Sequence, residues 1–139
     1  MLLDAFFPES GQALIDLAPP PVRDAFLAAD RDGAASIPPR SAAMFKVNDK
    51  DRAWVDAQCT PQPIRCGLQR LTLAGARERI AKKTYIRAAG YPSAPFDRAR
   101  EKARAGGWRI EEVACGHDVM LDAPARLAEI LQDELSRRD

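Results

Sequence analysis

The pattern of apolar and polar residues changes near Ile80, and the two sides of this point predict different structures. Residues 83–89 and 108–114 are rich in β-branched and aromatic side chains, which predicts two strands. Amphipathic helices are expected over residues 96–105 and again after Asp122, which is placed to cap the last helix. This order of strand, helix, strand and helix predicts a parallel sheet with right-handed crossovers.

The first half of the chain predicts short helices separated by turns, with little strand signal. Pro21 can open one helix, and residues 49–58 predict a second with Asp49 as its N-cap. Thr60-Pro61 has the composition of a further helix start. The chain holds 11 Pro against 8 Gly, which fits many short elements between turns.

The N-terminus predicts a strand over residues 1–7 that begins at once, without a cap or a lead-in. It has no basic start and no long apolar stretch, so it does not resemble a signal peptide. A chain that starts inside a strand is expected to be cut from a larger domain.

Composition narrows the classes of partner and cofactor. The 139 residues are 46% hydrophobic and 29% charged, which is typical of a globular fold. A net charge of +1 gives no electrostatic reason to expect nucleic acid or an anionic membrane, and no window is long enough for a membrane span.

The three cysteines form no C-x-x-C pair, and the chain has one histidine. These residues do not provide a metal ligand set at useful spacing, and no glycine-rich phosphate loop is present, so we expect no metal and no cofactor. An odd number of cysteines without a disulfide framework favours reduced thiols and a cytoplasmic protein.

His117, the one histidine, is the residue best placed for chemistry. It follows Gly116 in the loop between the second strand and the last helix. In parallel sheets functional residues gather past the carboxyl ends of the strands, where Asp4, Gly90 and His117 are all expected. An imidazole there can act as a general base, with one nitrogen toward a nucleophile and the other held by a carboxylate.

Residues 115–124, CGHDVMLDAP, with LAEIL at 127–131, resemble the C-terminal signature of α/β-hydrolases. The resemblance is to the branch of carboxylesterases that includes salicylate-type methylesterases, hydroxynitrile lyases and pyrethroid-hydrolase-like esterases. The segment KTYI at 83–86 resembles its penultimate strand, and TPQP at 60–63 resembles part of its helical cap. Residues 3–11 resemble the end of its sixth strand.

This resemblance implies the C-terminal portion of an α/β-hydrolase fold, with the last two or three parallel strands, flanking helices and a small helical cap. Residues 1–7 would end a core strand, residues 8–78 would form the cap region, and residues 79–139 would close the core. The chain would then supply about half of a hydrolase domain.

The resemblance also implies roles for individual residues. His117 would be the general base of a Ser-His-acid triad. The acid follows the penultimate strand in much of the superfamily, where this chain has Tyr91 and, later, Asp97; a second arrangement places it at the end of the sixth strand, which favours Asp4. Trp54, Met44 and Tyr91 are candidates for substrate binding, and Phe26 and Phe45 could also line a pocket, although residues of this kind are often core.

The nucleophile motif G-x-S-x-G is not found among the 139 residues. We therefore expect a serine-esterase-like part that contributes base and acid for hydrolysis of a small carboxylic ester but is inactive alone. One alternative is a non-catalytic fragment or binding module, which could form a homo-oligomer through an exposed sheet edge. A second alternative is an enzyme similar to hydroxynitrile lyases.

Overall fold

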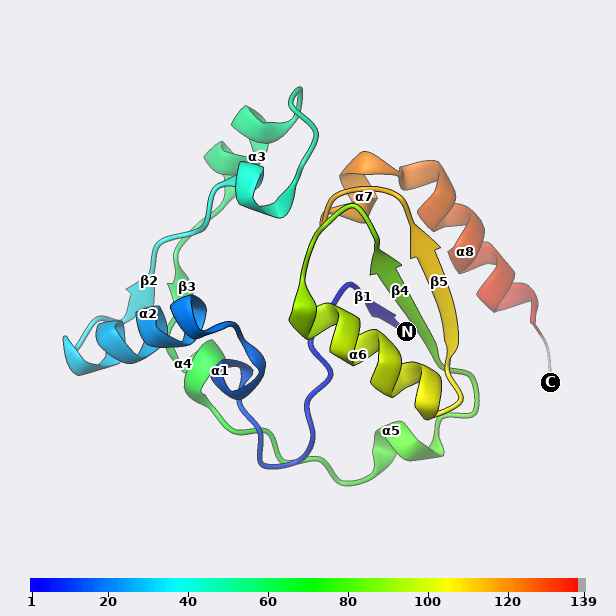
Figure 1. Cartoon of the computed structure of the whole chain (residues 1–139), viewed down its shortest axis with the longest axis horizontal. Coiled ribbons are helices and arrows are strands. Elements are labelled where there is room, and N and C mark those ends of the chain that lie inside the picture. The colour runs from blue at the N-terminus through cyan, green and yellow to red at the C-terminus, as the bar shows by residue number, and fades with distance from the viewer. Residues whose placement is uncertain (138–139) are drawn as a thin grey trace.

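A three-stranded parallel sheet with flanking helices forms one part of the structure, a computed structural model that describes residues 1–137 (Figure 1). The strands β1 (Leu2–Leu3), β4 (Thr84–Ala88) and β5 (Arg109–Val113) lie in the order β1-β4-β5. Leu2 pairs with Tyr85, and Thr84 pairs with Arg109. The predicted parallel sheet is therefore confirmed.

Successive residues of β4 face opposite sides of the sheet, and a separate apolar cluster covers each side. Tyr85 packs on the side of α6 (Ala94–Ala105), whereas Ile86 packs on the side of α7 (Val119–Asp122) and α8 (Pro124–Ser136). All five residues of β4 are buried, as expected of a central strand covered on both faces. The α6 side gathers Phe7, Tyr85, Ala99 and Ala103, and the α8 side gathers Ile86, Ala88, Val113, Val119 and Ile130.

A second, mainly helical part lies beside the sheet and is connected to it by the chain after β1 and by α5 (Ala76–Arg79) (Figure 1). Phe26 is its best buried aromatic residue, and a Cβ built on Gly67 would come within 2.3 Å of the Phe26 ring. The Phe26 ring of α2 can thus pack on the backbone at residue 67 only because this residue has no side chain. The elements are α1 (Leu14–Leu17), α2 (Pro20–Arg31), β2 (Ser36–Ile37), η1 (Ala42–Phe45), α3 (Arg52–Gln58), β3 (Gln62–Pro63) and α4 (Arg65–Leu68).

Two of the expected details in this helical part are wrong. Thr60-Pro61 does not start a helix, because the next residues form β3 and pair antiparallel with β2. Asp49 is not the N-cap of α3; Asp51 occupies that position, and Asp49 forms an ion pair with Arg52 instead. After Thr60-Pro61, pairing with a neighbouring strand outweighs the local helix preference of the sequence, whereas at Asp49 the helix start is shifted by two residues.

Asp122 does not cap the last helix, contrary to the sequence-based expectation. It is the last residue of α7, and Ala123 is the N-cap of α8. The Asp122 carboxylate instead accepts hydrogen bonds from the backbone of Gly116 and from Asn48. None of the helices within residues 1–137 has both the length and the apolar character needed to cross a membrane.

Candidate active site

His117 and Asp4 meet at the carboxyl edge of the sheet. Asp4 directly follows β1, and its backbone N–H donates to the carbonyl of Ile86 at 2.7 Å. His117 lies in the loop after β5, and its Nδ1 is 2.7 Å from Asp4 Oδ2. In the tautomer with the proton on Nδ1, this N–H donates to the carboxylate. Nε2 then has a lone pair that can accept a proton.

The second oxygen of Asp4 is held by two donors. Its Oδ1 accepts from Arg87 Nη1 at 2.8 Å and from the backbone N–H of Ala88 at 3.1 Å. Asp4 is only 1% exposed, so this buried carboxylate has an ion-pair partner and hydrogen bonds on both oxygens. Its φ of 39° is in the left-handed region, which costs a non-glycine residue conformational energy.

Asp97 lies on the far side of Arg87 from this pair. Its Oδ1 accepts from Arg87 Nε at 2.9 Å, and its side chain is about half exposed. No hydrogen bond joins Asp97 to His117 within residues 1–137. Of the two carboxylates considered as the acid, the structure therefore brings Asp4 into contact with His117. Asp97 contacts Arg87 instead.

The imidazole is enclosed by three aromatic rings. The rings of Phe45 and Phe96 stack on His117 at centroid distances of 5.3 and 5.4 Å, and Tyr91 lies at 5.1 Å. Burial raises the pKa of Tyr91, so its phenol stays protonated at neutral pH. Phe45 was among the cap residues expected to line a pocket, whereas Phe96 was missed, because its place on the inner face of the helix after the sheet predicts a core residue.

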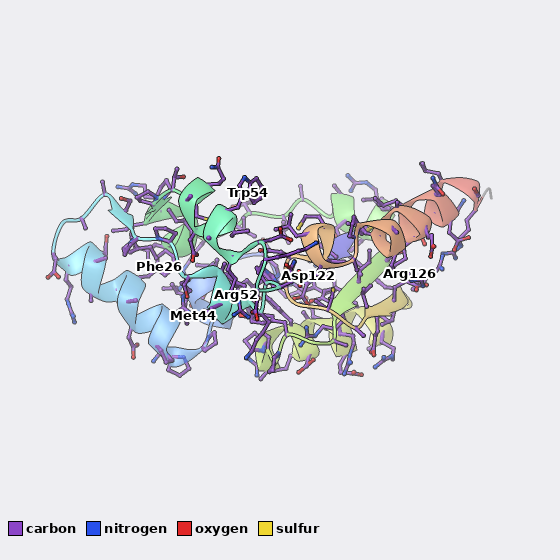
Figure 2. The ribbon with its side chains drawn as sticks, turned by 90° about the horizontal axis from the view of Figure 1, so that it is seen from above. Phe26, Met44, Arg52, Trp54, Asp122 and Arg126 are labelled. Carbon is purple, nitrogen blue, oxygen red and sulfur yellow. The ribbon has the colours of Figure 1, made fainter. Side chains whose placement is uncertain are left out.

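The helical part also fixes the backbone of the histidine loop. The N–H of His117 donates to the carbonyl of Phe45 at 2.9 Å, and Asp122 Oδ1 accepts from Asn48 Nδ2 at 2.7 Å. A Cβ on Gly116 would come within 2.1 Å of the Lys46 carbonyl oxygen, so this close approach requires glycine. Figure 2 shows Asp122 where the two parts of the molecule meet.

An apolar cavity of about 340 Å³ lies between the sheet and the helical part, behind the aromatic rings that pack on His117, and His117 itself does not line it. Three of its lining residues, Phe45, Tyr91 and Phe96, are the rings that pack on His117. A cavity of this size can hold a small ligand. The remaining lining residues are Phe6, Leu14, Pro19, Val22, Phe26, Ile37, Pro38, Pro39, Arg40, Cys59, Thr60, Gln62, Ser93 and Pro95.

Of the residues expected to contact substrate, Phe26, Phe45 and Tyr91 line this cavity. Trp54 and Met44 are 58% and 53% exposed and do not. Trp54 points away from the body of the molecule in Figure 2. These two placements correct the expectation, because the inner face of the short helices is set by what they pack against rather than by their largest side chains.

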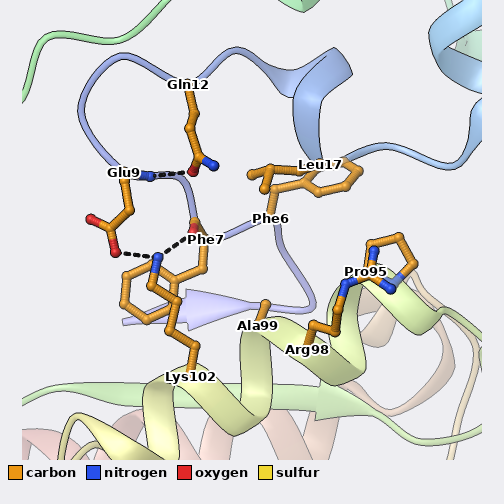
Figure 3. Close-up of a pocket in the computed structure, with 9 residues that line it drawn as sticks. All are labelled: Phe6, Phe7, Glu9, Gln12, Leu17, Pro95, Arg98, Ala99 and Lys102. Atoms are coloured by element: carbon orange, nitrogen blue, oxygen red, sulfur yellow. Dashed lines mark hydrogen bonds and ion pairs between the residues drawn. The ribbon is translucent and has the colours of Figure 1, made fainter.

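A smaller cavity of about 210 Å³ lies where the chain leaves β1, against α6 (Figure 3). Lys102 closes one side of it, donating to the Phe7 carbonyl at 3.1 Å and pairing with Glu9. Hydrogen bonds from Lys102 and Arg77 lower the pKa of Glu9. Since these polar groups satisfy one another, they anchor the segment after Asp4 to the core.

Within residues 1–137 no group of three or more His, Cys, Asp or Glu side chains is arranged to hold a metal ion. Cys59, Cys66 and Cys115 are free thiols. The pKa of the Cys115 thiol is raised, mainly by burial.

The comparisons with known proteins agree with this architecture, although no family model matches the chain. Over 140 residues the chain is 39% identical to a carbendazim hydrolyzing esterase from Nocardioides sp. (strain SG-4G), covering 93% of this chain and 57% of that protein. The matched region is the C-terminal part of the esterase.

Among solved structures, a similar chain is an extracellular α/β-hydrolase from a Paenibacillus species, described as sharing structural and functional homology with tobacco salicylic acid binding protein 2. The TM-score is 0.75 at 20% identity, over 95% of this chain and 59% of the other. The fold is thus that of an α/β-hydrolase. The chain corresponds to the C-terminal part of that fold and spans somewhat more than half the length of the relatives it matches.

Proposed function

We propose that the chain supplies the general base and the acid of a serine-type hydrolase that cleaves small, apolar carboxylic esters. The hydrogen bond of 2.7 Å between His117 Nδ1 and Asp4 Oδ2 carries the proposal. The apolar cavity between the sheet and the helical part supports the substrate class. The esterase named among the relatives supports the reaction type.

In this proposal His117 Nε2 takes the proton of a serine hydroxyl as its oxygen attacks the ester carbonyl. The same nitrogen then gives the proton to the departing alcohol, and the cycle repeats with water to release the acid. Asp4 keeps the proton of the neutral ring on Nδ1 and stabilises the imidazolium that forms. Phe45 and Phe96 would limit rotation of the ring between these steps.

The attacking serine is not expected among the 139 residues, since none of the five serines lies in a G-x-S-x-G motif. Ser93 is the one serine that lines the apolar cavity. It is the N-terminal flanking residue of α6 rather than part of a strand-to-helix elbow. We expect ester hydrolysis only when this part is joined to a segment that carries such a nucleophile.

A joined protein tests the proposal. The portion of the Nocardioides esterase that precedes the matched region is fused to the N-terminus of this chain, and hydrolysis of p-nitrophenyl butyrate is followed. We expect His117→Ala to lower kcat at least about 10³-fold, as loss of the base does in such triads. Trp54→Ala, at an exposed position away from the cavity, is the matched control and should leave kcat unchanged. Equal rates for His117→Ala and its parent would contradict the proposal.

A binding or oligomerising module is the second candidate. Within residues 1–137, β1 pairs with β4 on one side and has no strand on the other, and such an edge favours pairing. A homo-oligomer would bury this edge, which a concentration series in analytical ultracentrifugation would detect. Cleavage of cyanohydrins, as in hydroxynitrile lyases, and a cytoplasmic location stay predictions.

A further inference from the structure

Arg87 is a charged residue in the middle strand of the sheet, at a position where apolar residues are expected. It is 2% exposed, and the residues on both sides of it in β4 are also buried. Burial tends to lower the pKa of Arg87, but the hydrogen bonds and charges of Asp97 and Asp4 outweigh burial and raise it. The guanidinium is therefore a permanent cation at the sheet edge.

Each nitrogen of the Arg87 guanidinium holds a different part of the site. Nη1 donates to Asp4 Oδ1 at 2.8 Å and to the Ala88 carbonyl at 2.5 Å. Nη2 donates to the backbone carbonyl of Tyr91 at 2.7 Å. Nε donates to Asp97 at 2.9 Å. One planar group thus connects the acid, the loop after β4 and the first turn of α6.

We propose that Arg87 is the positioning residue of the His117–Asp4 pair, holding Asp4 Oδ1 and the Tyr91 loop so that Oδ2 faces the imidazole. The inference rests on the proposed function, because it assigns a residue to the same base and acid. Arg87 acts through Asp4 and Tyr91 and is not expected to contact the substrate.

The geometry gives two reasons for this role. Asp4 is buried and its Oδ1 accepts from two donors, of which Arg87 provides the charged one, so Arg87 is the stronger constraint on the orientation of the carboxylate. The Tyr91 ring packs on His117 while the Tyr91 carbonyl is bound to Arg87, so the same side chain also fixes one wall of the imidazole site.

Stability alone is a weaker explanation for a buried arginine at this position. A buried ion pair can often be replaced by apolar residues of similar size without loss of stability. A methionine of similar length would fit the same strand while removing all four donated hydrogen bonds. Arg87→Met therefore separates positioning of Asp4 from simple filling of the sheet.

The test uses the full 139-residue chain and proton NMR of its one histidine, which gives a single set of imidazole resonances. In the parent chain we expect a low-field Nδ1–H resonance from the hydrogen bond to Asp4. In Arg87→Met we expect this resonance to be lost while the amide spectrum stays dispersed. The matched control is Arg109→Met, in the next strand, which loses ion pairs to Asp133 and Glu134 but has no contact with Asp4. It should keep the resonance.

A second variant decides the matter if Arg87→Met does not fold. Asp97→Ala removes the outer partner of Arg87 at a half-exposed position, and we expect the Nδ1–H proton to exchange faster with water. A resonance that persists unchanged in folded Arg87→Met, or parent-like exchange in Asp97→Ala, would overturn the assignment. If the resonance responds as expected but His117→Ala does not slow ester hydrolysis, the proposed function fails and the contact between Arg87 and the pair stands.

Discussion

Replacing Asp4 by asparagine should reverse which nitrogen of His117 carries the proton. Arg87 Nη1 and the Ala88 N–H both donate toward the position of Asp4 Oδ1. The asparagine oxygen must therefore lie there, and its NH₂ group must occupy the position of Oδ2, facing His117 Nδ1. An NH₂ group donates, so Nδ1 has to accept and the proton moves to Nε2.

The size of this preference follows from the hydrogen bonds involved. Turning the amide around would set its NH₂ group against two donors and leave buried groups unsatisfied, at about 1–3 kcal/mol each. A difference of about 2 kcal/mol corresponds to a tautomer ratio of about 30 to 1. The Nε2–H form cannot take a proton from a nucleophile, and in Ser-His-Asp triads the same substitution lowers kcat about 10⁴-fold.

The tautomer is read directly from the ¹⁵N shifts of the imidazole in chain labelled with ¹⁵N-histidine. At a pH where the ring is neutral, we expect a protonated Nδ1 in the parent and a protonated Nε2 in Asp4→Asn. Asp118→Asn is the matched control, since Asp118 adjoins His117 in sequence but makes no hydrogen bond to the ring. The same tautomer in the parent and in Asp4→Asn would refute the reasoning about the amide orientation.

Three further predictions follow from the same geometry. The chain alone should not react with a fluorophosphonate serine probe; labelling that disappears in Ser93→Ala would show that the cavity serine is a nucleophile after all. Gly116→Ala should lower the free energy of unfolding in urea by about 1–3 kcal/mol, because its Cβ would meet the Lys46 carbonyl oxygen at 2.1 Å. Gly106→Ala, whose Cβ would have its nearest atoms at 3.4 Å, should leave the free energy of unfolding nearly unchanged. Burial raises the pKa of Tyr85 to about 12, so the folded state keeps a proton that the unfolded state loses near pH 10. The free energy of unfolding should therefore fall as the pH rises from 10 to 12, and Tyr85→Phe should remove this part of the pH dependence.

The sheet could be predicted from sequence because its signals are local. Residues 83–89 and 108–114 were expected as strands and form β4 and β5, within one or two residues at each end. Asp4 and His117 could be anticipated together because parallel strands end at one edge of a sheet.

The environment of the pair could not be predicted in the same way. Arg87 has little β-strand preference to mark it, and its role depends on Asp4 and Asp97, which are distant in sequence or on another element. Trp54 and Met44 were chosen by residue type, but the packing of α3 and η1 leaves both exposed. Asp122 has the composition of a helix cap, yet Gly116 and Asn48 occupy its carboxylate.

The most direct test of the central claim is kcat for ester hydrolysis by the joined protein carrying Asp4→Asn, compared with Asp118→Asn. If Asp4 is the acid that orients His117, Asp4→Asn should lower kcat about 10⁴-fold while Asp118→Asn stays close to the parent. An Asp4→Asn protein that hydrolyses the ester as fast as its parent would contradict the claim that this pair performs the reaction.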